Sequence, residues 1–184
     1  MRLLGISGSL RARSSNAELL RALALVARPG SELVMYRDLA HLPHFNPDLD
    51  AEGMVVSPAV EDLRRAVGEA DGLVISSPEY AHGVPGSLKN ALDWLVSGPE
   101  MIHKPVSLLN ASPRSIHAHA SLAETLRTMS AVLVDGACIA VPVSGRGLDA
   151  EQLVADDDVR SRLRAVVRVM EEAAREYQER RVAP

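Results

Sequence analysis

Residues 3–27 read LLGISGSLRARSSNAELLRALALVA, and their pattern indicates the fold class. Leu3–Ser7 is a short apolar run that is typical of a buried strand. Gly8–Asn16 is rich in glycine and serine, which favours a tight loop. From Ala17 to Ala27 the apolar residues recur at three- and four-residue spacing, which predicts a helix. A strand, a short loop and a helix in this order form the first part of a βαβ unit.

The same alternation continues along the chain. Further strands are predicted at Glu32–Tyr36, Gly72–Ser76, Pro105–Asn110 and Ala137–Val141. Further helices are predicted at Pro58–Glu69, Pro85–Val96, His117–Ser130 and Asp157–Arg180. Helices between successive strands imply right-handed crossovers, so we expect an α/β fold whose five-stranded parallel sheet is covered by helices on both faces. The 184 residues are predicted to form a single domain, with one long irregular connection at Arg37–Ser57.

The composition excludes several classes of function. The formal net charge is -4 and 24% of the residues are charged, so we expect no general attraction to nucleic acid or to anionic membranes. The N-terminal apolar run is too short for a signal peptide, and no apolar window is long enough to span a bilayer. The single cysteine, Cys138, lies in an apolar stretch that favours a packing role. These features predict a cytoplasmic location.

The loop Gly8–Asn16 has the composition of a phosphate site. Small hydroxylic residues and Arg11 follow a strand and precede a helix, whose first amides attract anions. Neither the P-loop motif nor the dinucleotide-binding glycine motif is present, so a phosphate monoester is favoured. An ordinary turn capped by Ser14 or Ser15, with Arg11 and Arg13 in solvent, remains open as the alternative.

A second stretch, residues 76–94, reads SSPEYAHGVPGSLKNALDW. Together with GSLRARSSN at 8–16, it resembles the NADPH-dependent FMN reductase family of flavodoxin-like quinone, azo and chromate reductases. The resemblance implies a flavodoxin-like doubly wound sheet of order 2-1-3-4-5 that holds FMN at its switch point. It implies that the phosphate and ribityl end is held by Ser9, Arg11, Ser14, Ser15 and Asn16. It implies that the ring is bordered by Pro78, Glu79, Tyr80, Ala81, Gly83, Ser112 and Arg114.

Each residue of the second stretch also has a plainer interpretation. Pro78 stiffens the loop, and Gly83 permits a close approach of the backbone. Tyr80 is equally consistent with a half-exposed loop aromatic, and for the Glu79 carboxylate we favour an ion pair at a subunit interface. Ala81 replaces the asparagine that is common in the family at this position. Lys89 and Asp93 are four apart, which is typical of a surface ion pair.

The third loop, Asn110–His119, lacks the paired glycines that are usual in the family. Two interpretations are open: bulky Arg114 and Ile116 narrow the ring pocket, or Arg114 lies against the pyrimidine edge of the ring and stabilises the negative charge that develops there on reduction. His117 and His119 point to different faces of a helix and are interpreted as solvated. The other histidines show no metal-ligand spacing either, so no metal is predicted.

The leading hypothesis is an enzyme that takes hydride from NADPH or NADH through the flavin N5 to a quinone-like or other small acceptor. The cofactor carries the chemistry, so no separate catalytic residues are expected. The alternative is a flavodoxin-type electron carrier, which the modest acidity and the 3% aromatic content disfavour. A homodimer or homotetramer is expected, built partly from residues 85–95, because Leu88, Leu92 and Trp94 exceed what one sheet-facing stripe requires.

Overall fold

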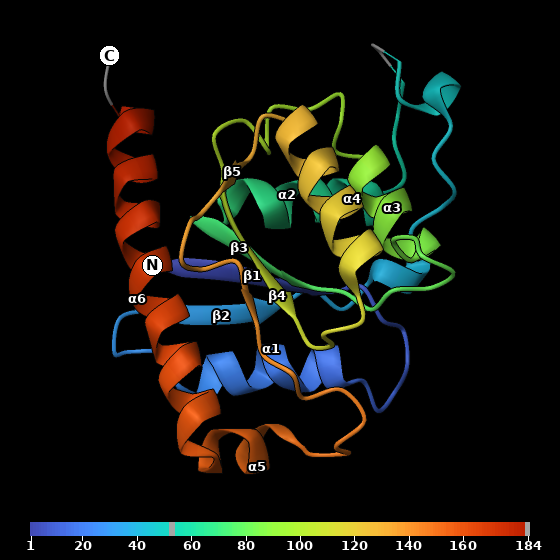
Figure 1. Ribbon diagram of the computed structural model, residues 1–184. Coiled ribbons are helices and arrows are strands. Elements are labelled where there is room, and N and C mark those ends of the chain that lie inside the picture. The colour runs from blue at the N-terminus through green and yellow to red at the C-terminus, as the bar shows by residue number, and fades with distance from the viewer. Residues whose placement is uncertain (52–53, 183–184) are drawn as a thin grey trace.

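A parallel sheet forms the centre of the computed structural model, which describes residues 1–51 and 54–182 (Figure 1). Its strand order is β2-β1-β3-β4-β5, with β6 also paired to β4, so the predicted order is confirmed. The strands are β1 Arg2–Ser7, β2 Glu32–Met35, β3 Gly72–Ser76, β4 Pro105–Asn110, β5 Val132–Leu133 and β6 Ile139–Ala140. All of the strand pairs are parallel.

The fifth position of the sheet is divided between two short strands. β5 pairs with the first residues of β4, and β6 pairs with the last two. Between them the chain turns at Gly136, whose φ of 79° lies in the left-handed region. The strand predicted at Ala137–Val141 corresponds to β6, whereas β5 was not predicted because two residues carry too little periodicity.

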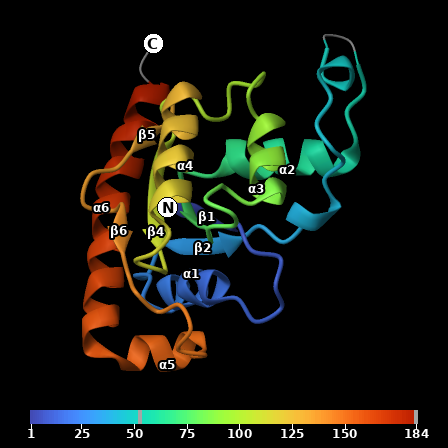
Figure 2. The ribbon, with the colours of Figure 1, turned by 45° about the vertical axis from the view of Figure 1, so that its right-hand side comes forward.

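Two helical layers cover the sheet, as Figures 1 and 2 show. One face packs against α1 Ser15–Leu25, α5 Ala150–Ala155 and α6 Asp157–Val182. The other face packs against α2 Pro58–Glu69, α3 Gly86–Asp93 and α4 Ile116–Thr128. Neighbouring strand residues alternate between the two cores, with Leu3 on the α1 side and Leu4 on the α2 side. Short 3-10 turns occur at η1 Leu39–His41 and η2 Pro47–Leu49.

Trp94 belongs to the core of the single chain. It is 1% exposed, and Leu88 and Leu92 are equally buried, so the expectation that these three side chains are available to a partner subunit is wrong. The Trp94 indole Nε1 donates to the Pro43 carbonyl at 2.8 Å, and the ring packs edge-on against Phe45. The surplus apolar residues of 85–95 therefore anchor the connection Arg37–Ser57, of which residues 52–53 lie outside the described part (Figure 2).

Over residues 1–51 and 54–182, none of the helices combines the length and the apolar character that a membrane span requires.

Candidate cofactor site

Two adjoining cavities open at the carboxyl ends of β1, β3, β4 and β6. The larger has a volume of about 680 Å³ and the smaller of about 260 Å³. Asn16, Pro78 and Ser144 line both cavities, so the two form a continuous site. This is the crevice in which doubly wound sheets bind their ligands.

The first loop lies directly against the end of β3. The Gly8 amide donates to the Ser76 carbonyl at 2.9 Å. A Cβ at Gly8 would come within 2.4 Å of the Ser77 Oγ, so only glycine fits at this approach. The loop is tightened further by the Arg11 amide, which donates to the Ser9 Oγ at 3.4 Å. As a result Ser9 and Arg11 line the larger cavity.

The beginning of α1 presents free amides to this cavity. Ser14 is the N-cap, and its hydroxyl accepts from the Ala17 amide. The amides of Ser15 and Asn16 have no acceptor among residues 1–51 and 54–182. Asn16 is 8% exposed and its Oδ1 accepts from the Ser76 hydroxyl, so the side-chain nitrogen Nδ2 of Asn16 is left for a ligand. The cap and the phosphate-binding interpretations of this loop are therefore compatible.

The charges around the larger cavity favour an anion. Glu18 caps α5 by accepting from the Ala150 amide and pairs with Arg21, and Asp149 caps the same helix. Both acids are thus occupied within the chain. Neither Arg11 nor Arg13 forms an ion pair with any residue that the structure describes, although both line the cavity. Arg13 is exposed, and its side chain also lines the larger cavity.

After β3, residues 80–83 form a tight turn closed by two backbone hydrogen bonds between Tyr80 and Gly83. Its central residues, Ala81 and His82, have φ of 48° and 61°, in the left-handed region. Pro78 and Tyr80 line the larger cavity, whereas Ala81 and Gly83 line neither. A Cβ at Gly83 would meet only the Tyr80 carbonyl at 3.5 Å, so no contact among the described residues requires glycine at this position.

Glu79 has a role inside the chain. Its Oε2 accepts from the Ala118 amide at 2.8 Å and so caps the start of α4. This contact gives the carboxylate a partner within the chain, and the interface role that we favoured for it stays a prediction. A second contact joins the same segments, because the His82 ring stacks on His117 with 4.3 Å between the centroids. The loop after β3 is therefore held to α4 on the side of the smaller cavity, which Glu79 also lines.

The third loop forms the opposite wall of the smaller cavity. The Asn110 side chain accepts from the Ser112 amide and donates to the Ser115 carbonyl, which fixes the turn without glycines. Ser112, Arg114 and Ser115 line the cavity, and Arg114 is exposed with no ion pair in the described part of the chain. Ser115 was not predicted, because its position depends on the way α4 begins.

His119 differs from the solvated residue that we expected. Burial lowers its pKa, and its Nε2 is buried with no hydrogen-bond partner in the described residues. His117 is exposed, although it stacks on His82. Cys138 is packed as predicted, and burial raises the pKa of its thiol. No group of three or more potential metal-ligating side chains occurs in residues 1–51 and 54–182.

A fourth loop completes the larger cavity and was missed in the sequence. It supplies Ser144, Gly145, Gly147, Leu148 and Asp149, and the first turn of α5 adds Gln152. Two signals were present: the glycines of Ser144–Gly147, whose φ angles are 79° and 68°, and the pair Asp149 and Gln152, which forms a capping box. The segment binds to the third loop through the Ser144 amide, which donates to the Ala111 carbonyl at 2.9 Å.

These features fit FMN. Free amides at the start of α1 and two unpaired arginines suit a phosphate monoester, and the adjoining smaller cavity is bounded by loop backbone and Arg114.

Comparison with known proteins agrees with this fit. The family described as NADPH-dependent FMN reductase matches residues 1–145. An NAD(P)H-dependent FMN reductase of Pseudomonas aeruginosa is 32% identical over 165 residues, which cover 87% of this chain and 88% of the relative. A quinone reductase of Escherichia coli is 37% identical over 107 residues, which cover 57% of this chain and 56% of the relative.

The fold has solved counterparts. The flavoenzyme NAD(P)H:(acceptor) oxidoreductase of Paracoccus denitrificans superposes with a TM-score of 0.71 at 24% identity. The superposition covers 94% of this chain and 98% of that one. At this identity the likeness shows the flavodoxin-like fold alone.

Proposed function

This chain belongs to the NADPH-dependent FMN reductase family and is an FMN-dependent NAD(P)H oxidoreductase, and on this basis we propose that the two adjoining cavities hold FMN and that the acceptor is a quinone-like small molecule. The observation that carries the proposal is the larger cavity, in which Arg11 and Arg13 lie without ion-pair partners in the described residues beside the free amides of Ser15 and Asn16.

The phosphate end of the site lies at α1. Ser9, Ser14 and Ser15 offer hydroxyls and amides, and Arg11 and Arg13 offer charge. Because Ser14 also caps α1, the loop is preorganised before any ligand enters. Asn16 lies next to the junction of the cavities, and its side-chain nitrogen Nδ2 is placed to bind the ribityl chain that follows the phosphate.

The ring end lies toward the smaller cavity. The chemistry that FMN supplies when bound is two-electron transfer from a reduced nicotinamide to the acceptor. The residues of this chain position the two substrates in turn and exclude water from the reacting face. Pro78 and Glu79 form one wall and Ser112 and Arg114 the other, with Arg114 providing positive charge. Tyr80 is 50% exposed at the mouth and offers an aromatic surface to a flat acceptor.

A two-substrate enzyme fits this site better than an electron carrier. Tyr80 is the one aromatic residue among those that line the two described cavities. One open face leaves room for nicotinamide and then for the acceptor, which predicts ping-pong kinetics. The relatives named quinone reductase support a quinone-like acceptor.

We propose three further features: a cellular location, a domain organisation and an assembly. We place the protein in the cytoplasm on the basis of its single, packed cysteine. We propose one FMN-binding domain over residues 1–184. We also propose a homodimer or homotetramer, now supported by exposed apolar side chains beside the site, Leu10 and Ile116, in place of the buried α3 residues. Light scattering at micromolar concentration tests the assembly, and a monomeric mass would exclude it.

The decisive experiment is anaerobic reduction. The purified protein is loaded with FMN, mixed with NADH or NADPH, and the flavin absorbance is followed. Rapid bleaching, reversed by a quinone, is the expected result. A protein that takes up no FMN, or whose bound FMN is reduced by neither nicotinamide, would overturn the proposal.

A further inference from the structure

A second large groove lies between α6 and the end of α1, on the outer surface of that helical layer. Its volume is about 800 Å³, and it is lined by residues 26–29 at the end of α1 and by one side of α6 from Asp157 to Arg168. None of these residues lines either cofactor cavity. The residues from α6 also lie beyond 1–145, the part of the chain that matches the reductase family. The groove is therefore separate from the cofactor site.

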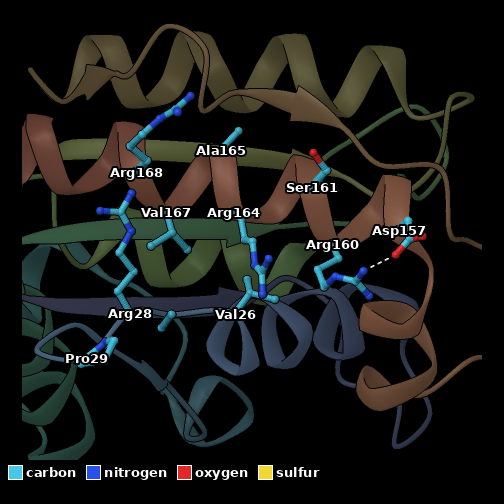
Figure 3. A pocket seen from close by; sticks show the side chains of 11 residues that line it. Val26, Arg28, Pro29, Asp157, Arg160, Ser161, Arg164, Ala165, Val167 and Arg168 are labelled. Carbon is cyan, nitrogen blue, oxygen red and sulfur yellow. Dashed lines mark hydrogen bonds and ion pairs between the residues drawn. The ribbon is translucent and has the colours of Figure 1, made fainter.

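The groove concentrates positive charge in an acidic protein. Four arginines and one acid line it, although the chain as a whole has a formal charge of -4. Asp157 pairs with Arg160, and Arg28 pairs with Glu171 at 3.4 Å. No acidic side chain within residues 1–51 and 54–182 lies within 4.0 Å of the Arg164 guanidinium. Figure 3 shows Arg28, Arg160 and Arg164 extending into the space between the two helices.

The charged residues of α6 that line the groove are arranged differently from those elsewhere on the helix. Elsewhere on α6 the four-residue spacing joins opposite charges, as in Asp158 with Arg162 and Glu176 with Arg180. Along the groove the same spacing places Arg160, Arg164 and Arg168 in succession. Like charges at this spacing disfavour a helix, and a bound anion would relieve their repulsion.

Part of the groove lining is apolar. Val26 and Ala27 come from the end of α1, and Ala165 and Val167 come from α6. A ligand that matches both features has a flat, weakly polar part for the apolar side chains and a strongly anionic group for the arginines. We propose that this groove is a second ligand site, which binds a nucleoside phosphate with its phosphates at Arg164, Arg28 and Arg160 and its base against the apolar side chains of the lining.

The test measures ADP binding to the FMN-saturated protein by isothermal titration calorimetry. Arg164→Gln removes the unpaired guanidinium and is expected to weaken ADP binding by roughly tenfold or more. Arg162→Gln is the matched control, because Arg162 lies two residues away on α6, pairs with Asp158 at 2.8 Å and does not line the groove. The control is expected to bind ADP as the wild type does, and both variants should oxidise NADPH normally.

Adenosine and pyrophosphate separate the two parts of the ligand. Each is expected to bind far more weakly than ADP, because adenosine lacks the charge and pyrophosphate lacks the base. The proposal fails if ADP does not bind, or if Arg164→Gln binds it as tightly as Arg162→Gln does. It also fails if ADP merely competes with NADPH to the same extent in all three proteins, which would place ADP at the cofactor site.

Discussion

The Glu79 carboxylate accepts a hydrogen bond from the backbone amide of Ala118, with 2.8 Å between Oε2 and N. One side chain thus caps α4 and ties it to the loop after β3, across 39 residues of sequence. Glu79→Ala removes this cap, and we expect a loss of about 1–2 kcal/mol in the free energy of unfolding, measured by urea denaturation of the FMN-free protein. Glu79→Gln keeps an acceptor and should lose less.

Glu172→Ala, on the exposed side of α6, should change stability by less than about 0.5 kcal/mol. Equal stability of Glu79→Ala and Glu172→Ala would show that the cap contributes nothing.

Ala81 carries backbone strain that another residue would relieve. Its φ of 48° is disfavoured for alanine, whereas glycine and asparagine adopt it readily. Ala81→Gly and Ala81→Asn should each stabilise the protein by roughly 0.5–1 kcal/mol in thermal or urea unfolding. FMN affinity should stay the same, because Ala81 lines neither cavity. Ala120→Gly, in the exposed part of α4, is the control and should destabilise by about 1 kcal/mol. If the Ala81→Gly variant were less stable than the wild type, the inference of backbone strain at Ala81 would be wrong.

Lys104 predicts a dependence of stability on alkaline pH. Its side chain is fully buried, donates to the Ala70 carbonyl and lies 4.7 Å from the centre of the Tyr177 ring. Burial lowers the pKa of Lys104 to about 8 from the ordinary 10.5. Between these two pH values the unfolded chain binds the proton that the folded chain has released, so stability rises as pH increases.

The contribution of Lys104 is isolated by comparison with Lys104→Met. The wild type should gain up to roughly 3 kcal/mol relative to the variant between pH 8 and pH 10.5. The comparison is needed because the pKa of Tyr36 is raised to about 12, chiefly by burial, which lowers stability from pH 10 upward in both proteins. A constant difference between wild type and variant over this range would contradict the lowered pKa of Lys104.

The sequence predicted the sheet and its main helices because those elements are long and periodic. Pro58–Glu69 was predicted with both ends correct, since Pro58 marks the first turn and Val60, Leu63 and Val67 form the buried stripe. α5 and β5 were missed because six and two residues give no usable period. For Trp94 the sequence indicated either the core or a subunit contact, and it could not decide between them because the partners of the ring, Pro43 and Phe45, are distant in sequence.

In the candidate site, too, local motifs could be predicted and long-range contacts could not. The loops after β1, β3 and β4 were identified because their motifs are contiguous in sequence. The loop Ser144–Asp149 was missed because it reaches the cavity only through the parallel pairing of β6 with β4. The occupied carboxylates of Glu79 and Glu18 depend on helix starts 39 and 132 residues away, which no local pattern reports.

Arg114 should affect the midpoint potential of the bound flavin more than the affinity of the site for FMN. It lines the smaller cavity, away from the amides of α1, and has no ion-pair partner in the described residues. In Arg114→Gln the loss of a nearby positive charge should lower the flavin midpoint potential by about 20 mV or more, in spectroelectrochemical titration. The dissociation constant for FMN should change little. Arg127→Gln, on α4 and away from both cavities, is the control. Unchanged potential in Arg114→Gln would mean that the guanidinium lies in solvent.

Arg11 should affect affinity through the phosphate. It lines the larger cavity beside Ser9 and the free amides of α1, so removing its guanidinium deletes a charge-assisted contact. Such a contact contributes about 1.5–3 kcal/mol, so Arg11→Ala should weaken FMN binding by roughly one to two powers of ten. Riboflavin lacks the phosphate, and its affinity should be nearly the same in wild type and variant. This contrast separates a phosphate contact from general damage to the loop.

Arg13 extends the same experiment, because it lines the same cavity without an ion-pair partner among the described residues. If both guanidiniums contact the phosphate, Arg11→Ala and Arg13→Ala should each weaken FMN binding, and the double variant should weaken it further, while Arg127→Gln leaves it unchanged. Fluorescence quenching on FMN titration measures all four proteins. An effect confined to Arg13→Ala would exchange the roles of the two arginines. If neither substitution matters, the serines and the α1 amides hold the phosphate alone, and the positive charge of the cavity has no part in binding FMN.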